Sequence, residues 1–121
     1  MLPPQVPVIT DTLFIAATDR VLAQIGEALD AALASSDADV DWTISEGILE
    51  VECDDGSKVI VNRHAPNREV WVAARSGGFH FRAHEGAWRD TRDARELGVA
   101  LAQILAEQAR LEVILPALRA P

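Results

Sequence analysis

Cysteine is almost absent from this chain, since Cys53 is the only one among 121 residues. A single cysteine excludes a disulfide within the chain and a metal cage built from cysteines, and it is compatible with a reducing compartment. Long apolar runs are also missing, and none approaches the ~20 residues that a membrane-spanning helix needs. The first residues have neither the basic nor the apolar region of a signal peptide. We therefore expect a cytoplasmic protein.

Positively charged residues are also few relative to negatively charged ones. The sequence has 11 lysines and arginines against 19 aspartates and glutamates, which gives a formal net charge of −8. Nucleic-acid binding is not expected, because phosphate contacts need a basic patch. A negative surface instead favours cationic partners, either metal ions or a basic protein surface. Acidity that serves solubility alone is the alternative.

Apolar residues make up 49% of the chain, which is enough for one hydrophobic core at this length. We expect a flexible, proline-rich tail over residues 1–10 and a single domain over residues 11–121. Apolar side chains recur at three- and four-residue steps from Phe14 to Leu33 and predict a helix over about residues 12–33. Thr10 or Asp11 can cap its start.

Alternation with a period of two follows this helix. It predicts strands over residues 40–45, 49–53, 58–62, 69–74, 79–81 and 87–89. Turns are expected at residues 46–47, 54–56 and 77–78, all of which contain glycine. If the aliphatic residues of the third and fourth strands face the core, Asn62 and Trp71 lie on the open face of the sheet. Cys53, Trp42 and Trp88 are expected to be buried.

A second helix is expected to begin near Asp93, because Asp93 and Glu96 have the spacing of a capping box. The apolar segment 111–115 should then lie over the gap between the two helices. The order of one helix, six strands and one helix predicts an α+β fold. We expect a two-layer sandwich, in which N- and C-terminal helices pack on one face of a six-stranded antiparallel sheet.

The segment between the third strand and the sixth strand has a recognisable pattern. It consists of Gly56–Asn62, Pro66, Val70–Ala74, Gly77–Phe81 and Trp88. In order and spacing this pattern resembles the frataxin family, and its bacterial CyaY-like members in particular. The resemblance covers residues 11–115 and implies a frataxin-like fold. The chain departs from the family at His64, where glutamine is usual, and at Gly26 and Ala31, which thin the acidic face of the first helix.

The resemblance implies a protein of iron–sulfur cluster assembly that binds iron weakly and docks on the cysteine desulfurase, with the iron–sulfur scaffold protein as a further partner. It places iron on an acidic ridge, defined as Glu27 and Asp30 on the helix and Asp37, Asp39 and Asp41 at the entry to the first strand. Oxygen ligands suit ferrous and ferric iron, and other divalent cations, with little selectivity. A monomer without enzymatic activity is expected. Oligomerisation with iron and weak ferroxidase activity are the alternatives.

The expected partner-binding residues are Asn62, Pro66 and Trp71, because an exposed tryptophan often lies at the centre of a binding surface. The three histidines lack the helical spacing of a metal-binding pair and are interpreted as loop or sheet-surface residues. The sequence shows neither a nucleophilic triad nor a glycine loop that opens a helix for phosphate binding. Two other functions stay open. One is an iron donor or store that slowly oxidises ferrous iron, and the other is an acidic interaction module that binds no iron.

Overall fold

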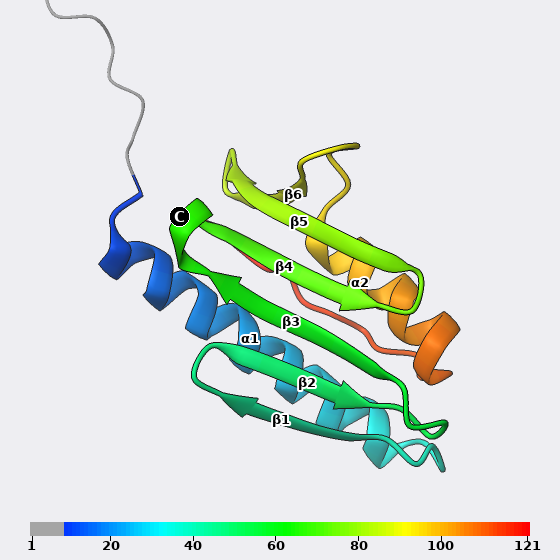
Figure 1. The fold of residues 1–121 in the computed structure, drawn as a ribbon. Coiled ribbons are helices and arrows are strands. Elements are labelled where there is room, and N and C mark those ends of the chain that lie inside the picture. The colour runs from blue at the N-terminus through cyan, green and yellow to red at the C-terminus, as the bar shows by residue number, and fades with distance from the viewer. Residues whose placement is uncertain (1–8) are drawn as a thin grey trace, which may run out of the picture.

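The computed structural model describes residues 9–121, and residues 1–8 of the expected tail lie outside this range. Its elements are α1 (Asp11–Ala34), β1 (Asp41–Ser45), β2 (Ile48–Glu52), β3 (Lys58–His64), the short helix η1 (Ala65–Asn67), β4 (Glu69–Ala74), β5 (Gly77–His84), β6 (Ala87–Asp90), α2 (Leu97–Ile104) and the π-helical turn η2 (Leu105–Ala109). All neighbouring strands are antiparallel, and they follow one another across the sheet in chain order. Figure 1 shows α1 and α2 behind the sheet, so the predicted two-layer α+β sandwich is confirmed.

Helix α1 begins and ends within a residue of its predicted bounds. The Oγ1 atom of Thr10 accepts a hydrogen bond from the backbone N–H of Leu13 (3.2 Å), which caps the helix. The apolar stripe faces the sheet, and Phe14, Val21 and Ile25 on this stripe are fully buried. Burial of each such side chain contributes ~1.5–3 kcal/mol. Packing against the sheet, more than intrinsic propensity, therefore holds α1 in place.

The inward face of the sheet is aliphatic, as the alternation predicted. Val59, Val61, Val70 and Val72 are at most 2% exposed. Trp88 on β6 is fully buried and meets the ring of Phe14 edge to face, with centroids 6.1 Å apart. This contact between an outer strand and α1 closes one continuous core, which also contains Cys53 as expected.

Strand β5 is longer than predicted, and the expected turn at Gly77 and Gly78 is wrong. These glycines pair with Ala74 and Ala73 of β4, and the turn falls at residues 75–76. Gly77 has a φ of 143°, a backbone conformation that is open to glycine and strained for other residues. Alternation could not find these two strand positions, because glycine has no side chain that alternates between faces.

Helix α2 also begins later than expected, at Leu97 rather than near Asp93. The intervening residues form a turn after β6. In this turn the carboxylate of Asp90 accepts a hydrogen bond from the backbone N–H of Arg92 (2.7 Å), and that of Asp93 accepts one from the N–H of Arg95 (2.9 Å). Asp93 therefore satisfies a loop N–H, because short acidic side chains compete for the backbone in turns as well as at helix ends.

The C-terminal segment, residues 110–121, runs back between α1 and α2, as Figure 1 shows in orange and red. Leu111, Val113 and Leu118 in this segment are buried. The indole N–H of Trp88 donates a hydrogen bond to the carbonyl of Arg119 (3.2 Å), which ties the segment to β6. The prediction that an apolar tail covers the gap between the helices is thus confirmed. No helix within residues 9–121 has the length and apolar character needed to cross a membrane.

Candidate functional site

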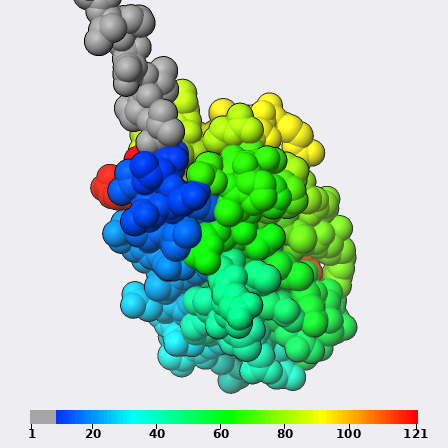
Figure 2. Space-filling view, turned by 60° about the vertical axis from the view of Figure 1, so that its left-hand side comes forward, coloured from blue at the N-terminus to red at the C-terminus, as the bar shows by residue number. Residues whose placement is uncertain are grey.

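The acidic ridge begins on the last turns of α1 and continues into β1. Glu27 and Asp30 lie on α1, Asp37 and Asp39 lie in the connection that follows, and Asp41 is the first residue of β1. All five side chains are exposed. Figure 2 shows the end of α1 in cyan beside the β1–β2 hairpin in teal, so the helix and the edge strand form one adjoining surface.

Trp42 joins the two halves of the acidic ridge. Its indole N–H donates a hydrogen bond to Oδ1 of Asp30 (2.8 Å). Its ring also lies so close to Gly26 that a Cβ atom there would stand 2.6 Å from Cη2 of the indole. Trp42 is therefore half-buried between α1 and β1 and not in the core, which corrects the sequence prediction. The contact fixes β1 against the helix and engages one oxygen of Asp30.

The acidic ridge is an open surface rather than a closed metal cage. Within residues 9–121, no three Asp, Glu, His or Cys side chains lie close enough together to hold a metal ion. Asp37 and Asp39 precede β1, so only Asp41 is held by strand geometry. Carboxylates spread over a surface bind hard cations through a few oxygens, with water filling the other positions. The arrangement thus suits a weakly held, largely hydrated cation or a cationic protein surface.

A second candidate site lies on the open face of the sheet, the side that faces away from α1 and α2. Asn62 on β3 is directly opposite Trp71 on β4, and Trp71 is opposite His80 on β5. Asn62 and Trp71 are both half-buried, so the structure places them side by side on the open face as predicted. Pro66 lies apart from them, exposed in η1 beyond the end of β3.

Two histidines enclose the indole of Trp71. The ring of His64 stacks on one side with centroids 3.6 Å apart, and the ring of His80 stacks on the other at 4.2 Å. Both rings are within 9° of parallel to the indole. The interpretation of these histidines as surface residues holds for their position but missed their role. The period-two pattern could have placed His80 on the same face of the sheet as Trp71. The contact from His64 depends on where β3 ends, which the pattern does not show.

Glu69 makes the buried polar contacts of this aromatic cluster, which consists of Trp71, His64 and His80. Its side chain is only 3% exposed, and its carboxylate accepts hydrogen bonds from the indole N–H of Trp71 (2.9 Å) and from the guanidinium of Arg82 (2.7 Å). Burial by itself would raise the pKa of the Glu69 carboxyl. The hydrogen bonds from Trp71 and Arg82 and the positive charge of Arg82 outweigh burial, so the pKa lies below its usual value. Glu69 therefore stays ionised and fixes the edge of the indole.

The turn that carries Pro66 is tied to the start of α1. Arg68 adopts a left-handed conformation with a φ of 53°, and its guanidinium pairs with the carboxylate of Asp11. The same guanidinium lies over the ring of Phe14, 5.8 Å from the centroid. Pro66 is therefore presented from a fixed turn.

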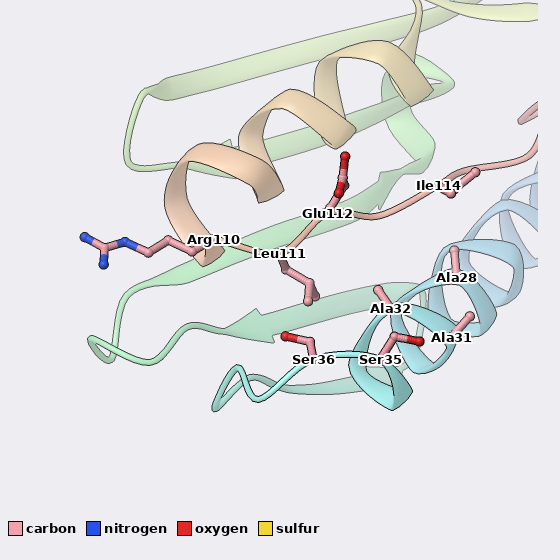
Figure 3. Close-up of a pocket in the computed structure, with 9 residues that line it drawn as sticks. All are labelled: Ala28, Ala31, Ala32, Ser35, Ser36, Arg110, Leu111, Glu112 and Ile114. Atoms are coloured by element: carbon pink, nitrogen blue, oxygen red, sulfur yellow. The ribbon is translucent and has the colours of Figure 1, made fainter.

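A hollow of about 410 Å³ lies between the end of α1 and the C-terminal segment. Figure 3 shows small side chains such as Ala28 and Ala32 along the helix side, with Leu111 between the segments. Arg110 points away from the other labelled residues. The lining combines alanine, serine and aliphatic groups with Glu112, which is not a donor set for metal binding or for acid–base chemistry.

The fold, the acidic ridge and the aromatic cluster of Trp71, His64 and His80 together define a small α+β protein with two candidate recognition surfaces. The sequence model of the family described as "Frataxin-like domain" matches residues 7–111, and the chain belongs to this family. The Ralstonia nicotianae protein named "Iron-sulfur cluster assembly protein CyaY" is 42% identical over 111 residues, which cover 92% of this chain and 98% of that protein.

Solved structures agree with this assignment. Frataxin from Psychromonas ingrahamii superposes with a TM-score of 0.71 at 28% identity, covering 86% of this chain and 95% of that one. The trimeric yeast frataxin that was crystallised with ferrous iron has a TM-score of 0.68 at 20% identity, and it covers 90% of this chain and 93% of that one. The yeast comparison supports the fold.

Proposed function

We propose that this protein takes part in iron–sulfur cluster assembly in the cytoplasm, where it binds ferrous iron weakly on the acidic ridge and docks on the cysteine desulfurase complex. The assembly role is the one for which its relatives are named. The same ridge serves iron and a basic surface of the desulfurase, because both are cationic. In this role the protein regulates iron–sulfur cluster assembly or delivers iron to it, and it does not itself turn over a substrate.

One observation carries this proposal. Within residues 9–121, none of the five carboxylates of the acidic ridge forms an ion pair with a lysine or arginine. Several acidic residues elsewhere on the surface are paired, for example Asp19 with Arg63 and Glu50 with Lys58, and others such as Glu112 are not paired within the described part of the chain. The acidic ridge differs in that five such unpaired carboxylates follow one another from the end of α1 into β1. A row of uncompensated, exposed carboxylates raises the local concentration of cations, which is what an iron-binding or desulfurase-binding surface needs.

The open face supplies a second docking surface in this proposal. Trp71 is held rigidly by Glu69 and by the two stacked histidines, and rigid aromatic side chains make efficient anchors at interfaces. Asn62 lies beside it, and Pro66 extends the surface beyond the strands. We assign this face to the desulfurase or to the iron–sulfur scaffold.

The lack of a three-ligand cluster within residues 9–121 favours a second candidate, an acidic interaction module that binds no iron. Isothermal titration with ferrous iron under anaerobic conditions separates the two. The test variant replaces Asp37, Asp39 and Asp41 by asparagine. Its control replaces Glu46, Glu85 and Glu107 by glutamine, which removes as many exposed charges outside the acidic ridge.

We expect the ridge variant to bind iron at least about tenfold more weakly, because a hydrated cation depends on the summed field of the carboxylates. The control should bind like the unmodified protein. Equal iron affinity in both variants would contradict the ridge as the iron site. Absence of iron binding in the unmodified protein, together with intact desulfurase binding, would establish the interaction module. Oxygen consumption and iron-driven oligomers would instead indicate an iron store with ferroxidase activity.

A further inference from the structure

The open face carries opposite charges at its two edges. The cross-strand register places acidic residues at the β1–β2 edge, namely Asp41, Glu50 and Glu52. At the β5–β6 edge the same face carries Arg82 on β5 directly opposite Arg89 on β6, with His80 and His84 on either side along β5. A chain with a net charge of −8 thus gathers two arginines side by side on one exposed face.

This arrangement is unfavourable for the isolated sheet. Like charges directly opposite each other destabilise an antiparallel pair. Arg82 has a counter-ion in Glu69 (2.7 Å). Arg89 donates to the carbonyl of Ala94 (3.4 Å), and within residues 9–121 no carboxylate lies within ion-pair distance of it. The fold therefore leaves Arg89 without a compensating charge.

We propose that this basic patch, defined as Arg82 and Arg89 with the neighbouring His80, is the docking point for a carboxylate-rich segment of a partner protein. The inference rests on the proposed function, because it assigns the partner chemistry of the open face. Two guanidinium groups on adjacent strands present several N–H donors that match carboxylates in pairs. Glu69 holds one of these groups in place from below through Nε and Nη2.

Groups next to the basic patch favour a protein over a nucleic acid. Both faces of the Trp71 indole are covered by His64 and His80, so a nucleobase has no open ring face on which to stack. Ile48, which is 42% exposed, lies in the same cross-strand row as Trp71. An exposed apolar side chain in the same row as an anchored tryptophan, with Asn62 between the two, fits the mixed core of a protein interface.

The consequence is that the two recognition surfaces require partners of opposite charge. The acidic ridge attracts a basic surface, and the basic patch attracts an acidic one. A single uniformly charged surface cannot satisfy both. The protein therefore either bridges two partners or meets one partner across a boundary between its basic and acidic regions.

The substitution Arg89→Glu tests the proposal with little risk to folding. The introduced carboxylate faces Arg82 across the strands and replaces repulsion by attraction, so thermal stability should be unchanged or higher. The control is Arg20→Glu, which makes the same charge change on the exposed surface of α1. Because it adds negative charge on the opposite layer, it should weaken neither surface.

Binding is followed by NMR at low salt with two probes, a decamer of glutamate and a single-stranded DNA oligonucleotide. We expect the glutamate decamer to shift the signals of His80, Arg82, Arg89 and the Trp71 indole, and Arg89→Glu to weaken its binding about tenfold. The control should bind like the unmodified protein. No shifts on the open face with the glutamate decamer, or equal binding by Arg89→Glu, overturns the proposal. Tighter binding of the oligonucleotide overturns it in favour of nucleic acid.

Purified cysteine desulfurase and scaffold protein form a second arm of the experiment. Loss of binding to one of them in Arg89→Glu, but not in the control, identifies the acidic partner. If neither protein binds while the glutamate decamer still does, the proposed function fails and the acidic-partner inference stands.

Discussion

At the scale of single residues, the contact between Gly26 and Trp42 decides how α1 lies against the edge of the sheet. Glycine inside a helix destabilises it by roughly 0.5–1 kcal/mol relative to alanine. Here the missing Cβ gives the indole room to reach Asp30. Gly26, which takes the place of an acidic residue on α1, therefore leaves the space in which Trp42 packs and connects α1 to β1.

This contact predicts the opposite of the usual effect for Gly26→Ala. The new Cβ would stand 2.6 Å from the indole, so Trp42 must move, and the free energy of unfolding should fall by about 1–3 kcal/mol. Urea denaturation measures the change. The matched control is Gly98→Ala on α2, where the nearest atom of another residue is Leu118 Cδ1 at 3.8 Å. That variant should be neutral or more stable, and a stabilised Gly26→Ala protein would contradict the packing described here.

Glu69 predicts a pH dependence whose sign follows from its lowered pKa. A carboxyl with a lower pKa in the folded state stabilises the fold above its unfolded pKa of about 4.5, and this contribution is lost as the pH falls through the folded value. Glu69→Gln should lower the free energy of unfolding at pH 7 by about 1–2 kcal/mol. The difference from the unmodified protein should shrink as the pH falls below about 4.5.

Chemical denaturation at several pH values between 7 and 3 tests this prediction. Glu85→Gln serves as the control, because the Glu85 side chain is 85% exposed and its loss should leave the stability profile nearly unchanged. A constant difference between Glu69→Gln and the unmodified protein across this pH range would show that the Glu69 charge does not contribute through its pKa.

Among single residues, the sequence was most informative where side chains alternate. Asn62 and Trp71 could be placed on the open face because their strands have a clear aliphatic side. The stack of His64 on Trp71 and the bond from Trp42 to Asp30 could not be predicted, since both depend on how strand ends and helix–strand distances settle in three dimensions. The sequence shows that residue 26 has no side chain, but it does not show that Trp42 packs into the space this leaves.

At the scale of elements, the C-terminal segment acts as part of the core although it has little regular structure of its own. It lies between α1 and α2 (Figure 1), and its buried side chains complete the layer behind the sheet. Gln108, near the end of η2, fixes the point at which the C-terminal segment begins by bonding to the sheet through its side chain. Its amide accepts a hydrogen bond from the backbone N–H of Arg75 (2.9 Å) and donates to the carbonyl of Lys58 (3.1 Å).

Two substitutions in this segment should therefore differ widely in effect. Leu118 is 2% exposed and Ile114 is 88% exposed. Leu118→Ala should lower the free energy of unfolding by about 2–5 kcal/mol, because it leaves a cavity in the core. Ile114→Ala should change it by no more than about 0.5 kcal/mol. Similar losses in both variants, measured by thermal or urea unfolding, would mean that the segment does not pack as described.

Element boundaries were predictable where a pattern and a cap agreed, as at Thr10 before α1. They were wrong where two local signals competed. Gly77 and Gly78 signalled a turn but belong to β5, and the acidic residue Asp93 signalled a helix start but closes a turn. For the glycines, pairing with β4 decided the outcome. For Asp93, the turn after β6 is closed by an isolated bridge between Arg89 and Glu96. Neither pairing is contained in a local pattern.

At the scale of the whole molecule, the distribution of charge matters more than its sum. The net charge of −8 indicated a negative surface and cationic partners. The structure instead separates an unpaired acidic ridge on α1 and β1 from a basic patch on β5 and β6. The framework that identifies the family, from Gly56 to Trp88, carries the aromatic cluster and two residues of the basic patch, His80 and Arg82, and Arg89 follows directly after it. The proposed iron site lies outside this framework.

The central claim is that iron binds on the acidic ridge and not at the histidine cluster around Trp71. Titration of the isotope-labelled protein with ferrous iron under anaerobic conditions, followed by amide NMR, tests it directly, because paramagnetic iron broadens nearby signals. We predict broadening of the amide signals of Glu27, Asp30 and residues 37–41, with the indole signal of Trp71 unaffected. Broadening centred on His64 and His80, or a spectrum unchanged by iron, would contradict the account.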